Sequence, residues 1–80
     1  MWYVYIIHSS KIDRYYVGIT ENLNTRLERH NSGWGRYTKR GIPWVMRYSE
    51  KYPTKTDALK REREIKKYKS RKYIEKLLNN

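Results

Sequence analysis

The sequence predicts an α+β domain in which one sheet of three strands is flanked by helices, in the order β-β-α-β-α-α. Segments with alternating side chains indicate strands, which we expect at residues 2–8, 15–19 and 44–49. Segments in which apolar residues recur at helical spacing indicate helices, which we expect at residues 23–31, 57–68 and 72–78. Eighty residues provide one thin core, so we expect a single domain over residues 1–80.

The first strand is apolar on both of its faces. Val4 and Ile6 lie on one face and Tyr5 and Ile7 on the other, which is typical of a strand near the centre of a sheet. The polar stretch after it, residues 9–14, suits a hairpin loop. The first two strands are therefore expected to pair.

The second strand contains a glycine, Gly18, on the same face as Tyr16. Glycine weakens a strand, and its presence often marks the close approach of another group to the backbone. A packed helix or a substrate phosphate would fit here, and the sequence favours neither.

The first helix carries two candidate functional side chains. Thr20 and Asn22 are both plausible N-caps, and Gly33 suits a left-handed residue after the helix end. Arg26 and His30 are neighbours at i,i+4, close to the apolar stripe. Each is weak evidence by itself, because a charge beside a stripe usually extends to solvent.

The chain is strongly basic, with 19 Lys and Arg against 8 Asp and Glu and a net charge of +11. Such a field usually attracts a polyanion. A long basic loop at residues 34–43 is a candidate contact, although the basic run at residues 55–76 also fits a solvated helix face. The candidate nucleic-acid-binding residues are Arg36, Lys39, Arg40, Arg61 and Lys66.

Composition also excludes several classes of protein. With no cysteine there is no disulfide framework, thiolate zinc site or thiol nucleophile. Two histidines are too few for an all-imidazole metal site, so any metal would be a hard cation bound by oxygen. There is no long apolar run for a membrane span, and no signal peptide. We expect a cytoplasmic protein.

The helix at residues 57–68 places one carboxylate among apolar residues. At about 100° per residue, Glu62 falls in the stripe with Ala58 and Ile65, whereas Glu64 faces solvent. A buried carboxylate is costly unless it is paired or binds a metal. Glu62 is thus either a salt-bridge partner of an Arg or Lys or a ligand of Mg²⁺, which commonly takes one or two carboxylates.

These residues together resemble the GIY-YIG nuclease superfamily, in particular its small single-domain members. The resemblance covers nearly the whole chain. The matching segments are Tyr3-Val4-Tyr5, Tyr16-Val17-Gly18-Ile19-Thr20, Arg26-Leu27-Glu28-Arg29-His30-Asn31-Ser32-Gly33, Tyr37-Thr38, Pro43 and Ala58-Leu59-Lys60-Arg61-Glu62.

The resemblance implies a three-stranded antiparallel sheet and a nuclease with one divalent cation, Mg²⁺ or Mn²⁺, bound by Glu62. It assigns hydroxyls of the site to Tyr5 and Tyr16, which by pattern alone are core residues. It makes Arg26 a phosphate clamp, and His30 matches a polar position that some members use. Many members also carry an asparagine in the last helix, where this chain has only the terminal pair at residues 79–80.

Phosphodiester hydrolysis needs a water nucleophile and stabilisation of negative charge. A tyrosine with an ordinary pKa of about 10 is a poor base at neutral pH, so we expect the positive field to lower the pKa of Tyr5 or Tyr16.

Three functions are compatible with these observations. The first is a divalent-metal-dependent endonuclease acting on DNA, for which the small size of the domain suggests selectivity for branches, flaps or nicks, and RNA is not excluded as a substrate. The second is a basic nucleic-acid-binding module whose site is idle. The third is a ribosome-associated or other structural RNA-binding protein.

Overall fold

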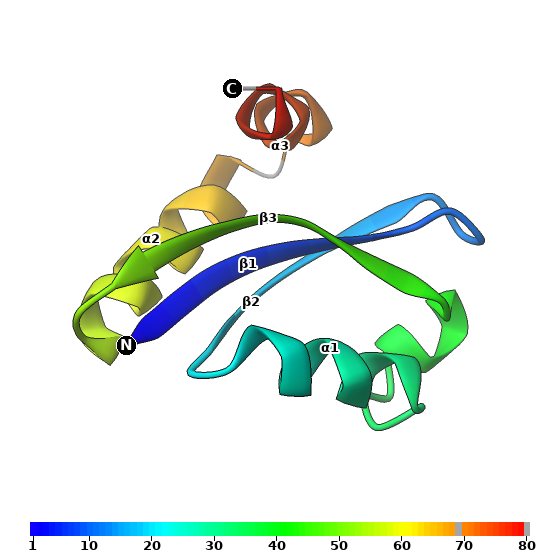
Figure 1. The fold of residues 1–80 in the computed structure, drawn as a ribbon. Helices are drawn as coiled ribbons and strands as arrows, with labels where there is room; N and C mark the ends of the chain where they lie inside the picture. Colours follow the sequence, from blue (N-terminus) through cyan, green and yellow to red (C-terminus); the bar gives the residue numbers. More distant parts are fainter. Residues whose placement is uncertain (69, 80) are drawn as a thin grey trace.

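The computed structural model describes residues 1–68 and 70–79, and it contains the predicted antiparallel sheet (Figure 1). The strands are β1 (Trp2–Ser9), β2 (Arg14–Thr20) and β3 (Trp44–Tyr52). The helices are α1 (Leu23–Asn31), the 3₁₀ helix η1 (Thr38–Gly41), α2 (Lys55–Tyr68) and α3 (Arg71–Leu78). The strand order is β2-β1-β3, so the prediction of an α+β fold with a central first strand is confirmed.

Strand β3 is longer than predicted and continues through Tyr52, which pairs with Trp2. The expected end at residue 49 is wrong, because Glu50 lies opposite Val4 in the ladder and receives hydrogen bonds from Tyr52 and Arg61. Helix α2 also begins slightly earlier than predicted. The Thr54 hydroxyl accepts a hydrogen bond from the backbone N–H of residue 57 at 3.2 Å, which caps that helix.

Helices cover both faces of the sheet (Figure 1). Helix α1 packs on the face that presents Tyr5, Ile7 and Trp44. Helices α2 and α3 cover the opposite face, where Ala58 and Ile65 meet apolar side chains of β1 and β2. Because successive side chains of β1 point to opposite faces of the sheet, the small core forms two layers, one on each face. None of the helices in residues 1–68 and 70–79 combines the length and apolarity needed to cross a bilayer.

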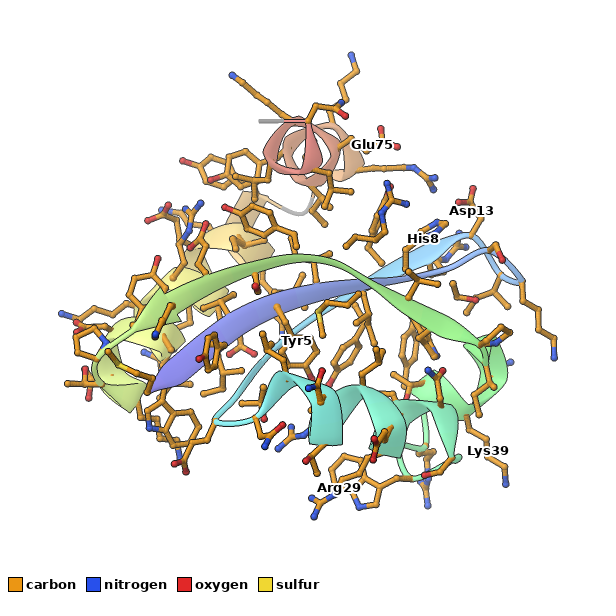
Figure 2. All side chains as sticks on the ribbon, in the orientation of Figure 1. Tyr5, His8, Asp13, Arg29, Lys39 and Glu75 are labelled. Carbon is orange, nitrogen blue, oxygen red and sulfur yellow. The ribbon has the colours of Figure 1, made fainter. Side chains whose placement is uncertain are left out.

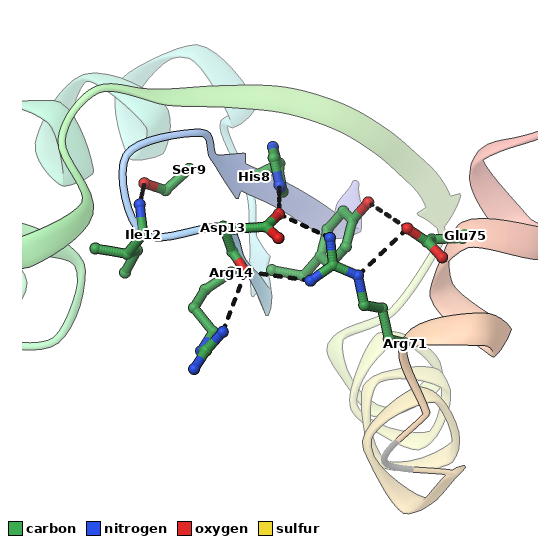
Figure 3. Close-up of polar contacts among 8 residues, drawn as sticks. His8, Ser9, Ile12, Asp13, Arg14, Arg71 and Glu75 are labelled. Atoms are coloured by element: carbon green, nitrogen blue, oxygen red, sulfur yellow. Dashed lines mark hydrogen bonds and ion pairs between the residues drawn. The ribbon is translucent and has the colours of Figure 1, made fainter.

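Helix α3 is held against the β1–β2 hairpin by an exposed ionic cluster (Figure 3). Asp13, which adopts a left-handed φ of 50°, accepts hydrogen bonds from Arg71 at 2.7 Å and from His8 at 3.0 Å. These two bonds, that of Arg71 first, lower the pKa of Asp13 to about 2. Arg71 also pairs with Glu75 at 3.3 Å, so the cluster links the hairpin to the start of α3.

Candidate active site

The candidate site is built around the phenol of Tyr5, which points from β1 toward α1 (Figure 2). Tyr5 lies directly opposite Gly18 in the β1–β2 register, and its ring passes over that glycine. A Cβ on residue 18 would lie only 2.6 Å from the Tyr5 hydroxyl oxygen. The close approach predicted at Gly18 is therefore made by Tyr5 itself, rather than by a helix or a phosphate.

The Tyr5 hydroxyl contacts a buried histidine. Its oxygen lies 2.9 Å from Nε2 of His30, which is only 2% exposed. The other ring nitrogen, Nδ1, lies 2.8 Å from Oγ1 of Thr38. The Thr38 hydroxyl in turn faces the carbonyl of Gly35 at 3.5 Å. If Thr38 donates to that carbonyl, Nδ1 carries the histidine proton, and Nε2 accepts the proton of the Tyr5 hydroxyl.

Burial lowers the pKa of His30, and the positive charge of Arg26 adds to the effect. The imidazole is therefore neutral near pH 7. A neutral Nε2 has a free lone pair, so it can accept a hydrogen bond or a proton from Tyr5.

Arg26 and Tyr16 lie next to this pair of side chains. The Tyr16 ring lies 6.4 Å from the ring of Tyr5 and 5.1 Å, edge to face, from that of His30. The Arg26 guanidinium donates to the carbonyl of Ile19 at 3.5 Å, and its Cζ lies 5.5 Å from the ring centroid of an exposed tryptophan, residue 34. Helix α1 and strand β2 thus bring a guanidinium and a second phenol to the same place.

The expected lowering of the tyrosine pKa is wrong for Tyr5. Burial raises the pKa of Tyr5 to about 12, the charges of Tyr16 and Glu62 add to the rise, and Arg26 opposes it. The desolvation of the phenol outweighs the overall positive field. Tyr5 is thus influenced by the charges of both Arg26 and Glu62.

Glu62 lies on the covered face of α2, as its spacing predicts. Its side chain is 17% exposed, compared with 54% for Glu64. Its ion-pair partner is Lys66, at 3.4 Å and one helical turn away. Lys66 is itself 55% exposed, and an ion pair of this kind contributes little to stability. The predicted salt bridge exists, but it leaves the carboxylate able to accept another cation.

The side chains that could coordinate a metal ion near Glu62 determine which ion the site could hold. Among residues 1–68 and 70–79, no three His, Cys, Asp or Glu side chains gather closely enough to enclose a metal ion. This excludes a closed, all-protein site in that part of the chain. A single covered carboxylate, paired with one exposed lysine, could supply one ligand to a Mg²⁺ ion, which retains water and binds substrate phosphate.

The remaining candidates fall into two groups. Arg36, Lys39 and Arg40 are exposed in and beside η1, and Lys66 is exposed beside Glu62. Arg61 does not join them. Its guanidinium donates to both oxygens of Glu50, at 2.8 and 3.1 Å, so it is already engaged in an ion pair.

Of the two terminal asparagines, Asn79 lies apart from the candidate site. Asn79 follows the end of α3 and lines a separate hollow with Tyr15, Arg47 and Glu75. Asn80 lies outside the described residues.

Sequence reasoning missed three side chains around the site. Thr38 is the partner of His30. Tyr37 stacks on Tyr16 with ring centroids 6.0 Å apart. Trp34 lies edge-on to His30 at 6.3 Å. All three are in or next to a loop without periodicity, and the only signal was the place of Tyr37-Thr38 among the matching segments.

This loop is fixed where it meets the sheet. The Asn31 side chain, at the end of α1, accepts from the backbone N–H of Trp44 at 2.6 Å and donates to its carbonyl at 3.0 Å. The Trp44 indole donates to the carbonyl of Thr38 at 2.6 Å. These bonds hold η1 beneath α1 and place the Thr38 hydroxyl at His30.

Comparisons with known proteins identify the family of this chain. The family model for the GIY-YIG catalytic domain matches residues 1–75. UPF0213 proteins of Staphylococcus aureus strains Mu3 and Mu50 are each 45% identical over 73 residues, covering 90% of this chain and 88% of the relative. The solution structure of UPF0213 protein BH0048 from Bacillus halodurans is 32% identical. It superposes with a TM-score of 0.60 and covers 99% of this chain and 84% of its own.

The GIY-YIG domain defines a family of nucleases, whose substrates are nucleic acids and which generally use a divalent metal ion. A match over residues 1–75, together with the phenol pair and the helix glutamate, leaves one conclusion. The chain belongs to the GIY-YIG family.

Proposed function

We propose that this protein is a divalent-metal-dependent endonuclease that hydrolyses phosphodiester bonds in DNA, with catalysis by Tyr5, Tyr16, Arg26, His30 and Glu62. The observation that carries the proposal is the buried hydrogen bond between Tyr5 and His30, 2.9 Å long. The charges of Arg26 and Glu62 act on the same phenol.

Glu62 would hold the metal ion, Mg²⁺ or Mn²⁺. When bound, a divalent cation would neutralise negative charge that develops on the phosphoryl oxygens. The positive charge of Arg26 would act on the same oxygens from the α1 side. The exposed cations of the loop, Arg36, Lys39 and Arg40, would bind flanking phosphates.

Tyr5 and His30 would move the proton of the attacking water. The raised pKa of Tyr5, about 12, makes the free phenolate rare at neutral pH. The phenol can nevertheless accept a proton from water if its own proton passes to Nε2 of His30, which is neutral and 2.9 Å away. Tyr16, beside both rings, would orient the water. This relay avoids the need for a strongly acidic tyrosine.

The proposal is tested with purified protein and a panel of labelled duplex, nicked, branched and single-stranded DNA. We expect cleavage with Mg²⁺ or Mn²⁺ and none with a chelator. Glu62→Gln should abolish cleavage and leave metal-free DNA binding intact. Glu64→Gln is the matched control, because its carboxylate lies on the same helix but faces solvent.

Two results would contradict the proposal. One is a wild-type protein that cuts no member of the panel, nor the corresponding RNAs, with either metal. The other is a Glu62→Gln variant that cuts as fast as Glu64→Gln.

A further inference from the structure

A groove of about 370 Å³ lies beside the proposed active site, along β2. Strand β2 is the outer strand of the sheet, and three consecutive β2 residues, Tyr15, Tyr16 and Val17, line the groove. Successive side chains of a strand point to opposite faces of the sheet. A groove that touches all three therefore lies at the edge of the sheet and is open to both faces.

The walls of the groove have the chemistry of a nucleotide site. On one side, Tyr37 stacks on Tyr16 with the ring planes 28° apart. On the other side lie Ile65 and Ile74, with Lys66 beside them. An aromatic face and an aliphatic wall suit a flat base, and an ammonium group suits its phosphate. The net charge of +11 favours such an anionic occupant over an apolar peptide.

The groove is continuous with the proposed catalytic residues. Tyr16 belongs to both, and Lys66 lines the groove while pairing with Glu62 at 3.4 Å. A base held in the groove would thus belong to a nucleotide next to the phosphodiester that meets Tyr5 and Arg26.

A base inside a continuous duplex is stacked on both faces and paired along its edge, so it cannot enter the groove without being extruded. We propose that this groove captures an unpaired base, and hence that the protein selects single-stranded, gapped or flapped DNA over continuous duplex. The inference rests on the proposed function for the position of the scissile phosphate.

Electrostatics alone would give the opposite preference. Duplex DNA has the higher charge density, and its binding releases more counterions for each phosphate neutralised than that of a single strand. Tighter binding of the single strand at equal salt would therefore require contacts to bases. The exposed face of Tyr37, a residue that is 48% exposed, is the surface available for such a contact.

The experiment measures binding by fluorescence anisotropy in a chelator. The probes are a labelled DNA single strand, its continuous duplex and the same duplex with a short gap. The variants are Tyr37→Leu, which removes the aromatic face, and Tyr37→Phe, which keeps it. Tyr68→Leu is the matched control, because Tyr68 is 56% exposed and also stacks on a tyrosine, Tyr73, with ring centroids 4.3 Å apart.

We expect the wild type to bind the single strand and the gapped duplex more tightly than the continuous duplex. Tyr37→Leu should weaken binding to the single strand by about tenfold, as expected for the loss of one stacked base, and binding to the duplex much less. Tyr37→Phe and Tyr68→Leu should bind as the wild type does. A 2-aminopurine base in the strand should lose fluorescence on binding to the wild type and keep it with Tyr37→Leu.

The inference is overturned if duplex and single strand bind equally, or if Tyr37→Leu weakens both to the same extent. Cleavage of the same probes with Mg²⁺ separates this failure from that of the proposed function. Equal cleavage of all probes by the wild type and Tyr37→Leu would refute base capture in the groove but not the proposed nuclease activity. Selective binding of the single strand without cleavage would support base capture and refute the nuclease activity.

Discussion

Glu50 and Glu62 are covered almost equally, with 18% and 17% of their side chains exposed, yet their surroundings differ. Glu50, on β3, accepts two hydrogen bonds from the Arg61 guanidinium and others from Tyr48 and Tyr52. Glu62, on α2, meets one ammonium at 3.4 Å. One carboxylate is saturated with donors and the other is not.

The difference shows that burial alone does not identify a functional carboxylate. Burial would raise the pKa of Glu50, but its bonds to Arg61 and the tyrosines outweigh this and hold the pKa below its ordinary value. A carboxylate with that many donors has no lone pair left for a metal. Glu62 has one ammonium partner, and its charge helps to raise the pKa of Tyr5.

Among variants at residues other than Glu62, the one that removes the Tyr5 hydroxyl should lose the most activity. Tyr5→Phe eliminates the proton relay to His30, so we expect single-turnover cleavage to slow by about 10²–10⁴-fold. Stability should fall by about 1 kcal/mol, because Nε2 loses its buried partner. Tyr52→Phe, which removes a hydroxyl that donates to Glu50, should leave the cleavage rate unchanged. Equal rates for the two variants would remove the functional distinction between the two regions.

Displacement of the same hydroxyl should have the next largest effect. In Gly18→Ala the new Cβ would lie 2.6 Å from the Tyr5 hydroxyl oxygen, so the phenol must move away from His30. We expect kcat/KM to fall by about 10²-fold and stability to fall by about 1–3 kcal/mol. The double variant with Tyr5→Phe should be no slower than Tyr5→Phe alone. Additive losses would mean that Gly18 acts through another group.

Loss of the Arg61 guanidinium, which pairs with Glu50, should lower stability and leave DNA binding intact. Arg61→Gln leaves Glu50 short of its main partner, and we expect about 2 kcal/mol of destabilisation in urea unfolding, less than for a fully buried pair because this one is partly exposed. Arg40→Gln should instead lower DNA affinity and reduce the salt slope by about 1, with stability unchanged. If the slope of log affinity against log salt concentration also falls in Arg61→Gln, Arg61 contacts DNA phosphates.

The effect of pH on the Tyr5–His30 pair should be the smallest. Because the pKa of His30 is lowered in the folded protein, the unfolded chain binds a proton more readily below about pH 6.5. Its contribution to stability is therefore complete above that pH and is lost as the pH falls below it. His30→Gln should flatten the dependence of the unfolding free energy on pH between about pH 7 and pH 5. An unchanged slope in His30→Gln would show that the imidazole is not buried in its neutral form.

Most of the backbone was predictable because its signals are local. Helix α1 has the predicted bounds, Asn22 caps it by accepting from the N–H of residue 25 at 3.0 Å, and Gly33 has the predicted positive φ of 86°. The end of β3 was not predictable, since Glu50 is stabilised by Arg61, which is remote in sequence.

The site was predictable only where a residue type limits the chemistry. Glu62 is identified by a charge in an apolar stripe, and Gly18 indicates a close approach without naming the approaching group. Thr38 and Tyr37 carry no such signal, because the loop that holds them is positioned by long-range bonds between Asn31 and Trp44. The rise in the pKa of Tyr5 depends on burial that only the packed structure defines.

The most direct test measures cleavage rate and unfolding midpoint together for Glu62→Gln and Glu50→Gln. For Glu62→Gln we predict a loss of metal-dependent cleavage of at least about 10²-fold with a stability change below about 1 kcal/mol. For Glu50→Gln we predict the reverse, a clear loss of stability and a normal rate for the folded fraction. A Glu62→Gln protein that cuts normally, or a Glu50→Gln protein that is stable and inactive, would contradict the assignment of the metal site to Glu62.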